Sequence, residues 1–127
     1  MREIAGARDF VTALCTRADC AVGIATGGWR AAARLKLAAI GLDRPSLALA
    51  TGSDARARAD IMQLAAQRTL AGRSSARRIY FGDREWDRAA CETLGFEFIA
   101  VGNAVEHAPR VADFSRPEQV LEMLALD

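Results

Sequence analysis

The sequence of 127 residues is poor in the residue types that build dedicated catalytic or metal sites: it has one histidine, three cysteines and a single lysine, Lys36. The cysteines form no C-x-x-C pair, which excludes a dithiol redox motif and the commonest cysteine-rich zinc sites. We expect them to be buried free thiols, as in proteins of the reducing cytoplasm. The lone His107 lies in a polar segment without partner ligands nearby, so we expect a surface histidine rather than a zinc ligand.

The sequence also lacks any apolar run long enough to span a bilayer and any signal-peptide pattern, so we expect no membrane partner. Its formal net charge is +1, which excludes a global electrostatic attraction to nucleic acid. A local basic patch does occur around one polar connector, but no aromatic residues interleave with it, and we expect no nucleic-acid partner. The patch consists of Arg68, Arg73, Arg77 and Arg78.

The composition is that of an ordinary globular protein, with 51% hydrophobic and 26% charged residues. A chain of this length can bury a core without disulfides or a structural metal. We find no internal repeat and no low-complexity linker, so residues 1–127 are predicted to form a single domain.

Strand and helix patterns alternate along the chain. Short continuous apolar runs are typical of strands buried on both faces, and apolar residues at helical spacing lie between them. This alternation predicts an α/β fold, a three-layer Rossmann-like parallel sheet with helices on both faces. The segment 110–114 is a candidate edge strand. The other predicted strands are 20–26, 46–51, 78–82 and 96–102, and the predicted helices are 7–18, 29–41, 57–72, 86–95 and 117–126.

Small polar clusters follow three of the predicted strands. They are Thr26-Gly27-Gly28, the segment 51–54, and Gly82-Asp83. In parallel sheets covered by helices, ligands bind beyond the carboxyl ends of the strands. The sequence therefore predicts that these clusters share one edge of the sheet.

The first cluster places a hydroxyl and two glycines between a strand and a helix. Gly27 and Gly28 let the backbone approach a ligand closely, and the helix N-terminus offers N–H groups to an anion. Thr26 with these amides suits a phosphate oxygen. The alternative is a tight strand-to-helix turn that Thr26 caps.

The third cluster supplies two carboxylates. Asp83 follows a strand and Asp87 lies one helical turn later, so both can face the same edge of the sheet. Hard oxygen ligands suit Mg²⁺, which usually takes one or two protein carboxylates together with water and phosphate. The alternative is that the two acids favour the helix dipole at an N-terminus.

Two arginines follow the second cluster. Arg56 or Arg58 could neutralise a phosphate or a nucleophilic carboxylate. The alternative for either residue is a solvated side chain.

Together these clusters resemble the haloacid-dehalogenase-like (HAD) hydrolase superfamily, whose members are mostly Mg²⁺-dependent phosphatases. The segment 22–42, "VGIATGGWRAAARLKLAAIGL", looks like the second motif of that family, in which a strand-end Ser or Thr contacts the transferring phosphoryl group, here Thr26. The segment 80–102, "YFGDREWDRAACETLGFEFIAVG", looks like the fourth motif, which implies Asp83 and Asp87 as metal-site acids. In place of the lysine of the third motif, the sequence offers Arg58 or Arg56.

The resemblance runs from about Gly6 to Gly102 and covers the second half of the family core. The first family motif, Asp-x-Asp, holds the nucleophile and the general acid/base and does not occur in this sequence. Because a main ligand of the metal site is lost with it, the resemblance implies that this chain alone binds Mg²⁺ weakly or not at all. In the family its strand lies between the strands that end here at Thr26 and Gly82. The resemblance therefore implies two pairs of strands that flank an unfilled position. Direct pairing, the segment 110–114 or another chain would have to close it.

Three interpretations remain open. The first is the C-terminal core of a HAD-type phosphohydrolase that acts on a small phosphorylated metabolite and is inactive as this chain alone. Its nucleophile strand and its cap would have been removed, be supplied by another chain, or be lost through a wrong start site. The second is a non-catalytic HAD-like interaction module that associates through unpaired sheet edges. The third is an unrelated α/β domain that binds phosphate or nucleotide.

Overall fold

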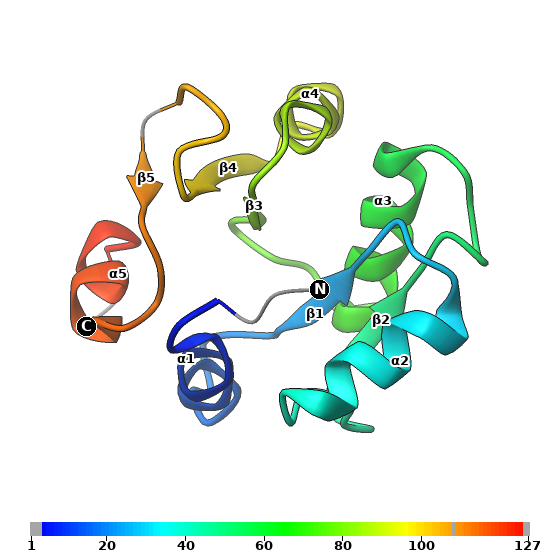
Figure 1. Cartoon of the computed structure of the whole chain (residues 1–127), viewed down its shortest axis with the longest axis horizontal. Coiled ribbons are helices and arrows are strands. Elements are labelled where there is room, and N and C mark those ends of the chain that lie inside the picture. Colours follow the sequence, from blue (N-terminus) through cyan, green and yellow to red (C-terminus); the bar gives the residue numbers. More distant parts are fainter. Residues whose placement is uncertain (1–3, 108, 126–127) are drawn as a thin grey trace.

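The computed structural model describes residues 4–107 and 109–125, which form five helices and five short strands (Figure 1). Helices and strands alternate from α1 to β4, and β5 then follows β4 without a helix between them. The strands make two parallel sheets, one with the order β1-β2 and one with the order β3-β4-β5. The predicted α/β class with parallel strands is therefore confirmed. The elements are α1 Ala7–Cys15, β1 Gly23–Ala25, α2 Arg30–Ala39, β2 Ala48–Ala50, α3 Arg58–Leu70, β3 Ile79–Gly82, α4 Glu85–Leu94, β4 Glu97–Val101, β5 Arg110–Val111 and α5 Pro117–Met123.

Helices cover both faces of the sheets. Successive residues of a strand point to opposite faces, so each strand packs against helices on both sides. In β4, Phe98 and Ala100 pack with residues of α3 and α4, whereas Ile99 and Val101 pack with residues of α1 and α5. The same alternation occurs in β2, where Leu49 joins the cluster of α2 and Ala50 joins that of α3. Strands buried on both faces explain the continuous apolar runs in the sequence.

The two sheets do not pair with each other in the described part of the chain, and β1 and β3 belong to separate sheets (Figure 1). The segment 110–114 supplies β5, which pairs with β4 at the opposite edge of its sheet and does not fill the position between the sheets. The Tyr80 hydroxyl of β3 lies 3.5 Å from the Ala25 carbonyl oxygen of β1 and donates to it. A side chain therefore joins the sheets where a strand ladder would be expected.

Some sequence predictions need correction. All three cysteines are free as predicted, but only Cys91 is buried, whereas Cys15 is exposed. His107 is half-buried instead of exposed, because its ring packs edge-on against Phe98 and its Nε2 lies 3.0 Å from the Phe98 carbonyl oxygen. Helix α5 ends at Met123. The last residue of the predicted helix, Leu126, lies outside the described residues.

Candidate functional site

A cavity of about 340 Å³ lies between β1 and β3, at the carboxyl ends of both strands. Its lining includes Thr26, Arg58, Asp83 and Asp87, so residues predicted from three separate segments come together at one place. Arg56, the other candidate from the third segment, is exposed and does not line this cavity. The position of the cavity agrees with the rule for ligand sites in parallel sheets.

Arg58 connects two of these segments. Its Nε lies 3.3 Å from Asp87 Oδ1, and its side chain is 22% exposed, so the ion pair is largely shielded from water. The other end of the guanidinium lies against the glycine turn, since a Cβ placed on Gly27 would be 3.0 Å from Arg58 Nη2. The missing side chain at Gly27 therefore makes room for the guanidinium, whose remaining N–H groups stay beside the Thr26 turn.

Asp87 is buried, with 4% of its surface exposed. Its Oδ2 accepts a hydrogen bond of 3.3 Å from the Arg84 backbone N–H, which satisfies one N-terminal amide of α4. Its Oδ1 is also buried and accepts no hydrogen bond. Burial raises the pKa of the Asp87 carboxyl, while the positive charge of Arg58 acts in the opposite direction. One oxygen thus has the structural role of a helix cap, and the other has only the ion pair with Arg58.

Gly82 makes this position of Asp87 possible. A Cβ on Gly82 would lie 2.8 Å from Asp87 Cβ and 2.9 Å from a ring carbon of Tyr80. Glycine at the end of β3 is therefore required for the close approach of the first turn of α4 to the strand. The Gly-Asp pair at this point in the sequence has a local packing reason in addition to any chemical role.

The Thr26 turn is built by contacts within itself and with the segment 51–54. The Gly28 N–H donates to Thr26 Oγ1 over 3.4 Å, so the hydroxyl caps its own turn, which was the alternative interpretation of this residue. The Gly52 N–H donates to the Gly28 carbonyl oxygen at 2.9 Å. A Cβ on Gly52 would lie 2.3 Å from the Gly27 carbonyl oxygen, so only glycine allows the two loops to touch.

The first amide of α2 already has a partner. Ser53 Oγ accepts a hydrogen bond of 2.9 Å from the Arg30 N–H, and Trp29, the residue before the helix, makes no side-chain cap. A phosphate at this turn would have to replace the shorter Ser53 bond to reach the first amide of α2, and only the long 3.4 Å bond to Thr26 Oγ1 to reach the Gly28 amide. Sequence reasoning did not identify Ser53 as a cap, because the cap comes from a loop 23 residues away along the chain.

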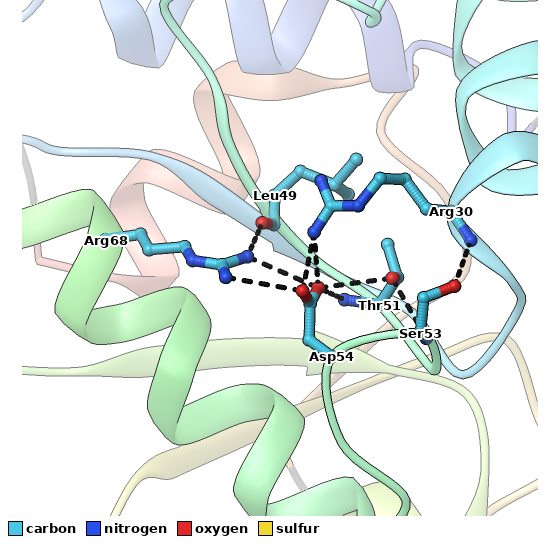
Figure 2. Close-up of polar contacts among 6 residues, drawn as sticks. All are labelled: Arg30, Leu49, Thr51, Ser53, Asp54 and Arg68. Carbon is cyan, nitrogen blue, oxygen red and sulfur yellow. Dashed lines mark hydrogen bonds and ion pairs between the residues drawn. The ribbon is translucent and has the colours of Figure 1, made fainter.

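Asp54 belongs to the second predicted cluster, but sequence reasoning gave it no role. Its carboxylate accepts two hydrogen bonds from Arg30 Nη2, at 2.6 and 2.7 Å, and two longer ones of 3.3 Å from Arg68 (Figure 2). It also accepts a bond of 2.8 Å from the Thr51 N–H. These bonds, above all those from Arg68, hold the pKa of Asp54 well below its usual range. Asp54 therefore fixes the loop that supports the Thr26 turn.

A divalent cation at this cavity would depend on Asp83 and Asp87. Asp83 is exposed at the end of β3, and the buried Asp87 Oδ1 lacks a hydrogen bond. Within the described residues, no three Asp, Glu, His or Cys side chains gather closely enough to hold a metal. Two carboxylates still fit Mg²⁺, because this ion commonly takes the rest of its ligands from water and phosphate. The Arg58 guanidinium would have to share Asp87 Oδ1 with the ion.

The register of the strands determines which backbone N–H and C=O groups face the space between β1 and β3. The Thr26 N–H donates to the Ala50 carbonyl oxygen, which turns the backbone groups of Ala25 away from β2. Likewise the Glu97 N–H donates to the Arg78 carbonyl oxygen, which turns those of Phe81 away from β4. Each sheet thus presents an edge to the space between them. Ile24, Tyr80 and Phe81 are only half-buried there, although β4 is almost fully buried.

Comparisons with family models and with curated proteins identified no relative of this sequence. No known family model matches the sequence, and no curated protein is similar enough to count as a match. In the described part of the chain, no helix has both the length and the apolar character needed to cross a bilayer.

Proposed function

We propose that this chain is the phosphoryl-binding part of a HAD-like phosphohydrolase core, whose substrate is a small phosphorylated metabolite of the cytoplasm. The observation that supports it most is the position of Arg58, between Gly27 of the second-motif segment and Asp87 of the fourth-motif segment. The segments that resemble three family motifs therefore line one cavity.

Each residue has a role in this proposal. Thr26 and the amides of Gly27 and Gly28 bind oxygens of the phosphoryl group. Arg58, or Arg56 if the loop rearranges, neutralises its charge. Asp83 and Asp87 hold Mg²⁺, which when bound would offset the negative charge of the phosphate.

Hydrolysis through an enzyme carboxylate needs a nucleophile that this sequence does not contain as Asp-x-Asp. A strand that carries this motif would fit between β1 and β3, where both sheets present an edge. We expect the 127-residue chain to bind phosphate and to hydrolyse no phosphate ester by itself. A test with p-nitrophenyl phosphate and Mg²⁺ should therefore be blank. Turnover that Asp83→Asn abolishes would refute the assumed absence of a nucleophile.

The metal part can be tested separately with Mn²⁺, a paramagnetic substitute for Mg²⁺. In the presence of phosphate, Mn²⁺ should broaden the amide NMR signals of residues 82–87 and those of the Thr26 turn. Asp83→Asn should abolish this broadening, while Asp60→Asn, which removes an exposed acid on α3, should leave it unchanged. Broadening that persists in Asp83→Asn, or that occurs elsewhere, would contradict the proposed metal site.

The edges of β1 and β3 favour a second candidate, a non-catalytic interaction module that accepts a strand from another chain or from a second copy. This candidate predicts association that depends on protein concentration in analytical ultracentrifugation, together with the loss of exchangeable amide protons in β1 and β3. It predicts no phosphate binding at Thr26, which distinguishes it from the first.

A further inference from the structure

A second cavity, of about 430 Å³, lies at the outer edge of β2, on the side of this strand that does not pair with β1. It shares no lining residue with the cavity between the sheets. Its volume lies within the range of small-molecule sites, about 300–1,000 Å³. The lining consists of Arg30 and Arg34 from α2, Asp43, Arg44, Pro45 and Leu47 from the following loop, Leu49 of β2 and Arg68 of α3.

Positive charge dominates this cavity. Four guanidinium groups line it, whereas Asp43 supplies the one carboxylate of the lining and Asp54 a second one that binds Arg30 and Arg68. The group as a whole therefore has a net charge of +2. Guanidinium groups that surround one space repel each other, and a bound anion would relieve this repulsion.

Two of the arginines are held in place before any ligand binds. Arg30 and Arg68 approach the Asp54 carboxylate from different helices, as Figure 2 shows, with distances of 2.6 Å and 3.3 Å. Fixed guanidinium groups lose less entropy when they bind an oxyanion, and each still has N–H donors left over. Arg30 and Arg68 are 40% and 38% exposed, so a ligand can reach them.

The other two arginines are less constrained. Arg34 Nε lies 3.4 Å from Asp43 Oδ1, and Arg34 is 59% exposed. Arg44 Nε donates to the Gly41 carbonyl oxygen at 2.7 Å. Each of these contacts uses one nitrogen of a group that carries five N–H donors.

Protection of the sheet edge explains only part of this arrangement. Arg68 Nη1 donates to the Leu49 carbonyl oxygen at 2.7 Å, which blocks one backbone acceptor on the open edge of β2. The parallel register turns the Leu49 N–H to the same edge, where it adds a backbone donor to the cavity. Neither Arg34 nor Arg44 contacts the strand edge, so edge protection does not require them.

We propose that this cavity is a binding site for a small organic ligand with a doubly charged oxyanion, such as a phosphate monoester. The arginines and the Leu49 N–H hold the oxyanion, and Pro45, Leu47 and Leu49 provide an apolar floor for the carbon part. Planar guanidinium groups match the oxygens of phosphate in pairs. This proposal does not depend on the proposed function, because the two cavities have separate linings.

The test is an NMR titration of the ¹⁵N-labelled protein with inorganic phosphate, without divalent cations and at constant ionic strength. We expect saturable shifts of the Leu49 amide and of the Nε–H signals of the four arginines, with a dissociation constant of about 1 mM or tighter. Phenyl phosphate should also shift the methyl signals of Leu47 and Leu49. If these methyl signals do not move, the proposed organic ligand is wrong.

Variants decide whether the binding is specific. Arg34→Gln should weaken phosphate binding by about tenfold, the cost of one charged hydrogen-bonding group. Its urea unfolding midpoint should not change, since its one ion pair is exposed. Arg110→Gln is the matched control, because Arg110 is exposed on β5 outside the cavity. Equal weakening by both variants, or shifts spread over arginines elsewhere, would overturn the proposal. Shifts at Gly27 and Gly28 that Arg58→Gln removes would report the other cavity.

Discussion

The Arg58–Asp87 ion pair gives the sharpest prediction about the candidate site. Replacement of Arg58 by Gln leaves Asp87 buried, with one oxygen that accepts no hydrogen bond and no longer has a counter-charge. Removal of one partner from a fully buried pair costs about 3–5 kcal/mol. Because Arg58 is 22% exposed and water can take its place, we expect a loss of about 2 kcal/mol in the free energy of unfolding at neutral pH.

The loss should depend on pH, and its sign follows from the pKa of Asp87. Burial raises this pKa in the folded state, so the native protein binds a proton more readily than the unfolded chain does. The contribution of Asp87 to stability therefore falls as pH rises through its pKa values. Arg58 lowers the pKa of Asp87, so this pKa is higher in the Arg58→Gln variant. The fall in the free energy of unfolding therefore continues further towards neutral pH in that variant. At low pH, where Asp87 is protonated in both proteins, the difference between them should disappear.

The measurement is urea unfolding of the wild type, Arg58→Gln and Arg56→Gln from about pH 4 to pH 8. Arg56→Gln is the control, because it removes the same charge at an exposed position two residues away. In the double variant Arg58→Gln, Asp87→Asn the pH-dependent loss should be absent. A loss in Arg58→Gln that is constant with pH, or equal to that in Arg56→Gln, would refute the reasoning.

Three further predictions concern the surroundings of the site. Gly52→Ala should destabilise the protein by about 2 kcal/mol or more in urea unfolding, because the added Cβ would overlap the Gly27 carbonyl oxygen. Gly28→Ala is the control and should be nearly neutral in the same assay, because its Cβ would meet only Thr26 Oγ1, at 3.9 Å. Asp54→Asn should lower the melting temperature at neutral pH. Folding lowers the pKa of Asp54, so the stability that Asp54 contributes is present above its unfolded pKa and is lost on acidification. A difference in melting temperature between Asp54→Asn and the wild type that does not shrink at low pH would argue against this. Burial raises the pKa of Cys91 to about 11, so a thiol reagent at pH 8 should label the exposed Cys15 in the native protein and label Cys91 only on unfolding. Equal labelling rates of Cys15 and Cys91 in the native protein would contradict the burial of Cys91.

Much of the fold could be predicted from local patterns. The continuous apolar runs of β1 to β4 and the helical spacing between them gave every one of these elements within a few residues, because burial on two faces leaves a clear signal. The resemblance implied two pairs of strands, whereas the structure has one sheet of two strands and one of three, because the segment 110–114 adds β5 to the second sheet. Exposure was harder to predict: Cys15 and His107 were assigned to the wrong environments, since a neighbouring apolar or polar residue does not determine which face a side chain occupies.

The candidate site was predicted in its residues but not in its supports. Thr26 and Asp83 follow strands, and Asp87 lies one helical turn after Asp83, which made their common edge predictable. The choice between Arg56 and Arg58 could not be made from spacing, since only the three-dimensional turn before α3 directs one of them into the cavity. Asp54 was overlooked because its partners, Arg30 and Arg68, lie 24 and 14 residues away along the chain, and no local pattern links them.

The most direct test of the proposed function is an NMR titration of the ¹⁵N-labelled chain with inorganic phosphate in the presence of Mg²⁺. We predict saturable shifts of the amides of Thr26, Gly27 and Gly28, stronger with Mg²⁺ than without it and absent in Arg58→Gln. If these amides do not respond at phosphate concentrations up to about 10 mM, or respond equally in Arg58→Gln, the cavity between β1 and β3 is not a phosphoryl-binding site.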